Sequence, residues 1–230
     1  MFYLDFRYIL FMAPAFIFSL IATIVVKSTF AKYSKIPSMY GLTGAEAARR
    51  MLDHAGIHNV SIERVSGFLT DHYDPSSRVL RLSPAVYDST SIASIGVACH
   101  EAGHAIQHAE SYFWLNLRSA SVPLANFGSG ASYIIIILGV LFSSANLIYL
   151  GCALFGLVLF FTIVTLPVEW NASARAKKQV LTSGLLGVSE RDGAASVLNA
   201  AFMTYVASAF STLLTFLYYL MLARSGGRRR

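Results

Sequence analysis

The feature that most constrains this chain is a run of fifty residues without a charged side chain, from Ser119 to Val168. A helix needs about 20 apolar residues to cross a bilayer, so this run is long enough for two crossings. Its one candidate turn is the segment Ser143-Ser144-Ala145-Asn146. We therefore expect two transmembrane helices, at about 121–142 and 145–168, joined as a tight hairpin.

Two further apolar stretches lie near the ends of the chain, at 8–26 and at about 201–223. The first is too long for the apolar part of a signal peptide, and Lys27 follows where small cleavage-site residues are needed, so we expect a retained helix. Charged residues make up only 13% of the chain, against roughly 25% in soluble domains. The mean hydropathy is +0.56. These features predict an integral membrane protein with about four transmembrane helices.

The sizeable polar segment, residues 27–118, lies between the first two apolar spans. Thr43 and Glu46 form a capping box that starts a helix, and Gly56 can close that helix. Residues 60–64 and 78–82 are typical of short strands, and turn residues at 74–77 separate them, which predicts a small antiparallel element. A further helix is expected from about 91 to 109. The expected fold class is α+β, mainly α, in a single domain over residues 1–230.

The helix expected at about 91–109 carries His100-Glu101-Ala102-Gly103-His104, which is the H-E-x-x-H pattern of zinc hydrolases. Residues four apart share one helix face, so His100 and His104 can aim their imidazoles at one ion. Glu101 lies beside them, positioned to take a proton from a water that the metal holds. The alternative is a surface helix with incidental histidines. This helix is mostly apolar and expected to be buried, where unpaired histidines are costly, so the pattern predicts a zinc site.

A hydrolytic zinc site has three protein ligands and one open position, so a third ligand is needed. His108 lies one further helical turn from His104, too far to share the ion with both motif histidines. Glu110 stands where the longer pattern H-E-x-x-H-x-x-G-x-x-H has its third histidine. However, Gln107 replaces the glycine that would turn the chain back.

Of the other carboxylates after the motif, Glu190 and Asp192 suit the N-terminal cap of the last helix. Glu169 remains, at the end of the third span. The motif helix precedes the hairpin and Glu169 follows it, and two crossings return the chain to the same side of the membrane. Trp114 and Trp170 are suited to anchor the entry and the exit at the interface. We predict Glu169 as the third ligand, with Glu110 as the next candidate.

The net charge of +6 comes from mostly scattered basic residues. They lack the interleaved aromatic residues of a nucleic-acid surface, so they predict attraction to a lipid bilayer and no nucleic-acid partner. Near the span ends, seven basic residues lie on the motif side and five on the other, which favours a cytoplasmic active site. The five include Arg228, Arg229 and Arg230. If the last helix crosses the membrane fully, this basic tail lies on the side opposite the motif, which opposes the cytoplasmic assignment.

The chain has two cysteines, Cys99 on the motif helix and Cys152 in the third span. Two cysteines provide no disulfide framework. A free cysteine behaves as a small apolar residue, so we expect two buried thiols rather than metal ligands.

Several motifs together resemble the YugP-like bacterial zinc-dependent membrane peptidases. The matching segments are Gly41–Gly44, Leu69–Pro75, Leu80–Pro84, His100–His108, Glu169–Ala176 and Val197–Ala201. They cover nearly the whole chain and are far more specific together than the zinc motif alone. The resemblance implies an endopeptidase at a bacterial cytoplasmic membrane, with an integral membrane zincin-like metalloprotease fold.

The chain is more distantly similar to HtpX-like and CAAX-prenyl membrane proteases. Those also place a transmembrane hairpin between H-E-x-x-H and a glutamate ligand in an E-x-x-A-D pattern. Here Ser173 stands where that aspartate would be. The difference leaves Glu169 in place, and Asn171 or Ser173 is then the candidate that orients a metal ligand.

The polar segment holds further candidates for the chemistry. His72 or Tyr73 can donate a hydrogen bond to the oxyanion of a tetrahedral intermediate. Asp71 can accept a hydrogen bond from a zinc-bound histidine. In zincin-like sites a strand just before the motif helix pairs with the extended substrate. The edge strand expected to do so here consists of Val79, Leu80, Arg81 and Leu82.

The sequence thus predicts an endopeptidase with one Zn²⁺, held by His100, His104 and Glu169, that cleaves membrane or membrane-adjacent proteins. Glu101 assists the attack of the zinc-bound water on the peptide carbonyl. A narrow processing peptidase is one alternative within the same class. A non-catalytic zinc-binding scaffold or sensor is the other alternative, but structural zinc normally has four protein ligands. His₂Glu sites also accept other divalent metals.

Overall fold

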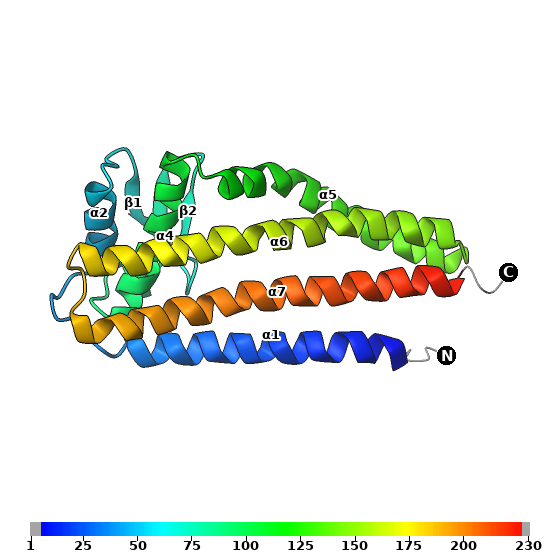
Figure 1. Ribbon diagram of the computed structural model, residues 1–230, viewed down its shortest axis with the longest axis horizontal. Coiled ribbons are helices and arrows are strands. Elements are labelled where there is room, and N and C mark those ends of the chain that lie inside the picture. Colours follow the sequence, from blue (N-terminus) through cyan, green and yellow to red (C-terminus); the bar gives the residue numbers. More distant parts are fainter. Residues whose placement is uncertain (1–5, 227–230) are drawn as a thin grey trace. The chain divides into compact units, whose positions relative to one another are not determined.

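The computed structural model describes residues 6–226, so residues 1–5 and 227–230, with the three terminal arginines, lie outside the described residues. The chain is mainly helical with one small sheet, as the sequence predicts. Its elements, in chain order (Figure 1), are α1 (Phe6–Tyr33), α2 (Gly44–His54), β1 (Ser61–Arg64), β2 (His72–Asp74), β3 (Val79–Leu82), α3 (Pro84–Tyr87), α4 (Ile92–Ala109), α5 (Phe113–Leu141), α6 (Ala145–Thr182), η1 (Val188–Glu190) and α7 (Arg191–Gly226).

The described residues divide into two compact units. The first, which we call the helical unit, takes in residues 6–22, 116–167 and 204–226. The second, the mixed unit, takes in residues 23–115 and 168–203, with all three strands. The metal motif and Glu169 both belong to the mixed unit.

Within residues 6–226, four stretches of helix are long and apolar enough to cross a membrane, which confirms the expected number. They are Phe6–Tyr33, Phe113–Leu141, Ala145–Val180 and Val188–Ser225. The third helix is longer than its apolar run, because α6 continues through the polar residues after Val168 to Thr182. No proline or glycine interrupts residues 168–182, so the helix has no local reason to end at the last apolar residue. Glu169 therefore lies within a continuous helix rather than at its end.

The predicted hairpin of α5 and α6 is confirmed in the helical unit. The connection is short, and Ser143 has a positive φ of 50° there. Small residues let the two helices approach closely. A Cβ added to Gly128 would lie 2.5 Å from the carbonyl oxygen of Leu154, and one on Gly139 would lie 2.7 Å from a side-chain carbon of Ile148.

The sheet of the mixed unit differs from the expected antiparallel pairing of its first and last strands. The strand order is β1-β3-β2, in which β3 pairs in parallel with β1 and antiparallel with β2. Residues 72–74, part of which was expected to be a turn, form the extra strand. The carboxylate of Asp74 accepts hydrogen bonds from Ser76 and Ser77, which holds the tight turn between β2 and β3.

This topology also corrects the predicted substrate edge, Val79, Leu80, Arg81 and Leu82. These residues form β3, which is the central strand and is hydrogen-bonded on both sides. The backbone groups of a central strand are already paired, so they offer no edge to an extended peptide. Leu80 and Leu82 are instead fully buried in the core of the mixed unit.

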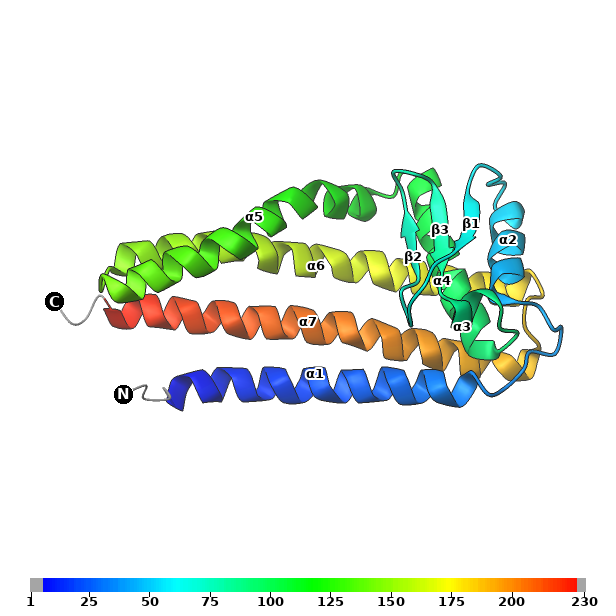
Figure 2. The ribbon, with the colours of Figure 1, turned by 180° about the vertical axis from the view of Figure 1, so that it is seen from behind.

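Helix α4 is the central element of the mixed unit, in contact with α2, α3, β2 and β3. Figure 2 shows the sheet beside it. Residues 92–96 and 98–107 of this helix are buried. The helix begins where the sequence predicts, because the side chain of Ser91 accepts a hydrogen bond from the amide of Ser94 at 3.1 Å.

Candidate metal centre

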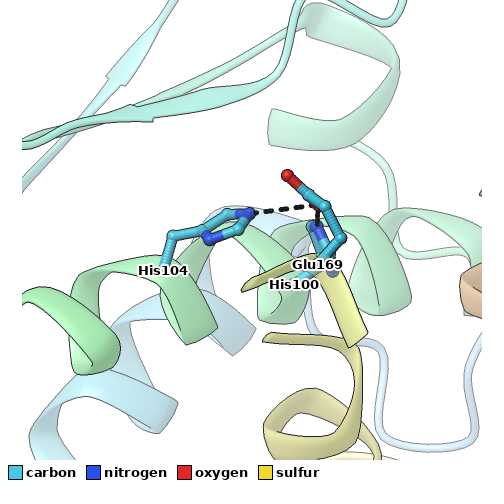
Figure 3. A group of neighbouring side chains, drawn as sticks. All are labelled: His100, His104 and Glu169. Atoms are coloured by element: carbon cyan, nitrogen blue, oxygen red, sulfur yellow. Dashed lines mark hydrogen bonds and ion pairs between the residues drawn. The ribbon is translucent and has the colours of Figure 1, made fainter. Parts of the chain in front are cut away.

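Three side chains of the mixed unit converge on one point. His100 and His104 project from successive turns of α4, and Glu169 projects from α6 (Figure 3). Glu169 Oε2 lies 3.2 Å from His100 Nε2 and 3.5 Å from His104 Nε2. The three side chains are buried, and Glu169 is only 1% exposed. Within residues 6–226 this is the one group of three metal-ligating side chains with donor atoms close together.

The spacing of these donor atoms suits a zinc ion. Ligands about 2.0–2.1 Å from a tetrahedral ion lie about 3.3 Å from one another. The two nitrogen–oxygen distances of 3.2 Å and 3.5 Å bracket this value. Two imidazoles and one carboxylate also match the donor set of hydrolytic zinc sites, which leave one position open. The cluster could therefore hold one metal ion.

The second ring nitrogen of each histidine has its own partner. Ser173 Oγ lies 3.2 Å from His100 Nδ1, and Gln107 Oε1 lies 3.0 Å from His104 Nδ1. An amide oxygen can only accept, so His104 donates from Nδ1 to Gln107, which leaves Nε2 as the ring nitrogen that faces the cluster. Ser173 thus contacts a candidate ligand, and its orienting role stays a prediction.

Gln107 belongs to the site as well, although the sequence pattern marks it only as the residue that replaces a glycine. It is fully buried, and its Nε2 donates to the carbonyl oxygen of Val168 and to Asn171 Oδ1, each at 2.9 Å. Asn171 therefore reaches His104 through Gln107 rather than directly. A glutamine one turn after a ligand histidine on a buried helix is the signal that indicates such a role.

Glu101 follows His100 on α4 and is buried, with 9% of its surface exposed. Burial alone disfavours the charged form of His104. The hydrogen bond and charge of Glu169, together with the charge of Glu101, outweigh this effect and raise the pKa of His104. Two carboxylates thus make the cluster attractive to a cation. A carboxylate beside the donor cluster is also where a proton acceptor is needed.

Asp71 does not contact either candidate ligand, so its predicted role beside a zinc-bound histidine is wrong. Its carboxylate instead accepts hydrogen bonds from the amide of Ser83 at 2.7 Å and from Ser83 Oγ at 3.0 Å. The Nδ1 atoms of both histidines are already occupied by other partners. Burial raises the pKa of Asp71 above its ordinary value.

The two oxyanion candidates on β2 have different surroundings. His72 is exposed, and its Nδ1 lies 2.8 Å from the carbonyl oxygen of Thr70. The hydroxyl of Tyr73 lies 2.8 Å from His108 Nδ1, on the helix that carries the motif. Successive side chains of a strand point to opposite faces, so Tyr73 is on the face toward α4 and His72 is not. Burial raises the pKa of Tyr73 above its ordinary value.

The alternative third ligand, Glu110, lies outside the cluster. It caps the C-terminus of α4, and its Oε2 accepts a hydrogen bond from Arg175 Nη2 at 2.6 Å. That hydrogen bond lowers the pKa of Glu110. Both cysteines are buried free thiols, as the sequence predicts, and burial raises the pKa of Cys99 to about 12.

A glycine holds α4 close to α6 beside the cluster. A Cβ on Gly103 would lie 2.8 Å from the carbonyl oxygen of Ala172. We expect Gly103→Ala to lower the stability by about 1–3 kcal/mol and to weaken metal binding, because the methyl group pushes α4 away from the helix that carries Glu169. The matched control is Gly96→Ala on the same helix, where the Cβ would lie at an ordinary 3.7 Å from Ala194.

The thermal midpoint and zinc content of both variants in detergent check this prediction. Alanine favours a helix interior by up to about 1 kcal/mol over glycine, so Gly96→Ala should melt at or above the wild-type temperature. Equal midpoints and equal zinc contents for the two variants would contradict the packing argument.

The fold and the cluster together define a class of protein. Within the described residues, four helices suited to span a membrane accompany a buried His₂Glu cluster with a carboxylate near it, which is the combination that membrane zinc peptidases have. Comparison with known proteins agrees. Residues 8–224 match the family described as "putative neutral zinc metallopeptidase", and the chain belongs to this family.

A curated relative extends the match to a membrane protein. The chain is 49% identical over 201 residues, covering 87% of this chain and 89% of the relative, to "Putative membrane protease YugP" of Bacillus subtilis (strain 168). No solved structure matches the chain. The resemblance inferred from the sequence motifs is therefore confirmed.

Proposed function

We propose that the protein is a zinc-dependent endopeptidase that hydrolyses peptide bonds of membrane or membrane-adjacent proteins. The observation that carries the proposal is the three-donor cluster of His100, His104 and Glu169 with the buried carboxylate of Glu101 next to it. Three protein donors leave one position open for the reacting groups, whereas a structural zinc site is closed by four.

Each residue has a distinct part in the proposed reaction. When bound, a zinc ion supplies Lewis-acid polarisation of the peptide carbonyl and makes water more acidic. Glu101 takes a proton from the attacking water as the water oxygen bonds to the carbonyl carbon. Glu101 then delivers that proton to the amine nitrogen as the carbon–nitrogen bond breaks. Tyr73, on the strand face toward α4, is the better-placed of the two candidates to donate a hydrogen bond to the oxyanion.

The proposed location is a bacterial cytoplasmic membrane with the active site on the cytoplasmic side. The support is the excess of basic residues near the span ends on the motif side. The bacterial relative, whose name describes a membrane protein, is consistent with a membrane location.

Cleavage by the purified protein tests the proposed function. The protein is reconstituted in lipid nanodiscs and incubated with fluorescence-quenched peptides, some soluble and some with a membrane-spanning segment. We expect cleavage that ortho-phenanthroline abolishes and that added zinc restores. The non-chelating isomer meta-phenanthroline is the matched control and should have no effect. Zinc-loaded protein that cleaves no member of either peptide set would contradict the proposal and favour a scaffold or sensor.

A further inference from the structure

A continuous line of hydrogen bonds runs from a candidate ligand to the surface of the mixed unit. His104 Nδ1 bonds to Gln107 Oε1 at 3.0 Å, and Gln107 Nε2 bonds to Asn171 Oδ1 at 2.9 Å. The same oxygen of Asn171 accepts from Arg175 Nε at 2.7 Å, and Arg175 Nη2 donates to Glu110 Oε2 at 2.6 Å. The line thus crosses from α4 to α6 and back to the end of α4.

We propose that Arg175 is a positioning residue for the metal centre, which acts on His104 through Asn171 and Gln107. This role rests on the proposed function, because it presumes a zinc ion held by His104. Arg175, Asn171 and Gln107 would support that ion without touching the metal or the substrate. It gives a role to an arginine that lies six residues beyond Glu169 in the sequence.

The hydrogen-bonding capacity of each amide makes this line directional. Gln107 is fully buried, and both hydrogens of its Nε2 are used, by the carbonyl oxygen of Val168 and by Asn171 Oδ1. Its Oε1 must therefore face His104, because the amide cannot flip without losing its hydrogen bonds to both the Val168 carbonyl oxygen and Asn171 Oδ1. Asn171 Oδ1 serves two donors at once, so the position of Arg175 determines where that oxygen lies.

The outer end of the line is held at the surface. The side chain of Arg175 is 23% exposed and that of Glu110 is 56% exposed. Both residues and Asn171 line a cleft of about 480 Å³. Arg175 is therefore anchored by one exposed carboxylate outside and one amide oxygen inside. A guanidinium presents its donors in a fixed planar fork, which suits an anchor of this kind better than a flexible ammonium group.

A pair of variants at Asn171 separates positioning from simple packing. Asn171→Asp keeps an acceptor oxygen for Gln107 and Arg175, whereas Asn171→Leu keeps the approximate volume and removes the acceptor. We expect Asn171→Leu and Arg175→Gln to weaken zinc binding about 10-fold or more, within the range measured when partners of metal ligands are removed. Asn171→Asp should stay close to the wild-type affinity.

Lys177→Gln is the matched control on the same helix. Lys177 Nζ donates to Asn199 Oδ1 at 2.6 Å, so this change also removes a basic side chain and a short hydrogen bond to an asparagine. It lies outside the line to His104 and should leave zinc affinity unchanged. Affinity is measured by competition with a chromophoric chelator. Visible absorption of the Co²⁺-substituted protein reports the ligand geometry directly, which a loss of stability alone would not alter.

The outcomes distinguish this proposal from the proposed function. Changed Co²⁺ spectra and weaker zinc binding in Asn171→Leu and Arg175→Gln, with rescue by Asn171→Asp, would support it. Zinc affinities and Co²⁺ spectra of Asn171→Leu and Arg175→Gln that equal those of Lys177→Gln would overturn it. The proposed function would still stand in that case if zinc binding is lost when His104 or Glu169 is replaced. Equal losses in Asn171→Leu and Asn171→Asp would also overturn it, because the acceptor oxygen would then be irrelevant. Wild-type protein that binds no zinc would overturn both.

Discussion

Replacing Glu101 by glutamine is expected to lower kcat/KM for peptide cleavage by about 10²–10⁴-fold, the usual contribution of a general acid–base group. Glutamine has nearly the same shape as glutamate but cannot accept a proton from water. Glu101 is not among the three converging donors, so zinc content should stay at that of the wild type. Cleavage of a quenched peptide and elemental analysis of the same sample measure the two effects together.

The control for this variant is Glu63→Gln, which changes an exposed glutamate in β1. It alters the net charge of the mixed unit in the same way and should leave cleavage unchanged. Cleavage by Glu101→Gln at the wild-type rate would exclude the proposed mechanism and favour a non-catalytic zinc scaffold or sensor.

Replacing Glu169 by alanine is expected to remove most of the bound zinc. Zinc sites with four ligands bind with about 10–16 kcal/mol, or about 3 kcal/mol per ligand, so one lost ligand weakens binding by about 100-fold. The loss of Glu169 also removes the one carboxylate among the described residues that contacts both buried imidazoles. Elemental analysis of detergent-purified protein should give about one zinc per chain for the wild type and a small fraction of that for the variant.

Glu110→Ala is the control that separates the two candidate third ligands. Glu110 pairs with Arg175 and lies outside the cluster, so its removal loosens only the outer end of the line to His104 and should leave far more zinc bound than Glu169→Ala does. Full zinc occupancy in Glu169→Ala would contradict the assignment. A loss in Glu110→Ala with retention in Glu169→Ala would place the third ligand at Glu110.

Much of the site could be predicted from the sequence because its determinants are local or follow from the membrane. The spacing of His100 and His104 places them on one helix face without reference to the rest of the fold. Glu169 was found by elimination and by the rule that two crossings return the chain to the same side. The structure brings this residue within 3.5 Å of both histidines, although it lies 65 residues or more from either.

Other features depended on contacts that no local pattern encodes. The strand at His72–Asp74 is only three residues long, and its last residue belongs to a segment of turn-forming residues. The sequence therefore did not predict this strand or its pairing with β3. That pairing makes β3 central and removes the predicted substrate edge. Asp71 has the chemistry to support a histidine, but the amide and hydroxyl of Ser83 are its partners.

The sequence by itself determined the four apolar helices, the start of the motif helix at about residue 91 and the residues that could hold a metal. Hydropathy, capping and helical periodicity depend on residues that are close together in the sequence, so they can be recognised in a single stretch of the chain. Only the tertiary structure decided the strand order, the partners of the histidine Nδ1 atoms and the line from Gln107 to Arg175. These features join residues far apart in the chain, and a polar side chain accepts any suitably placed donor, so the fold alone selects the partner.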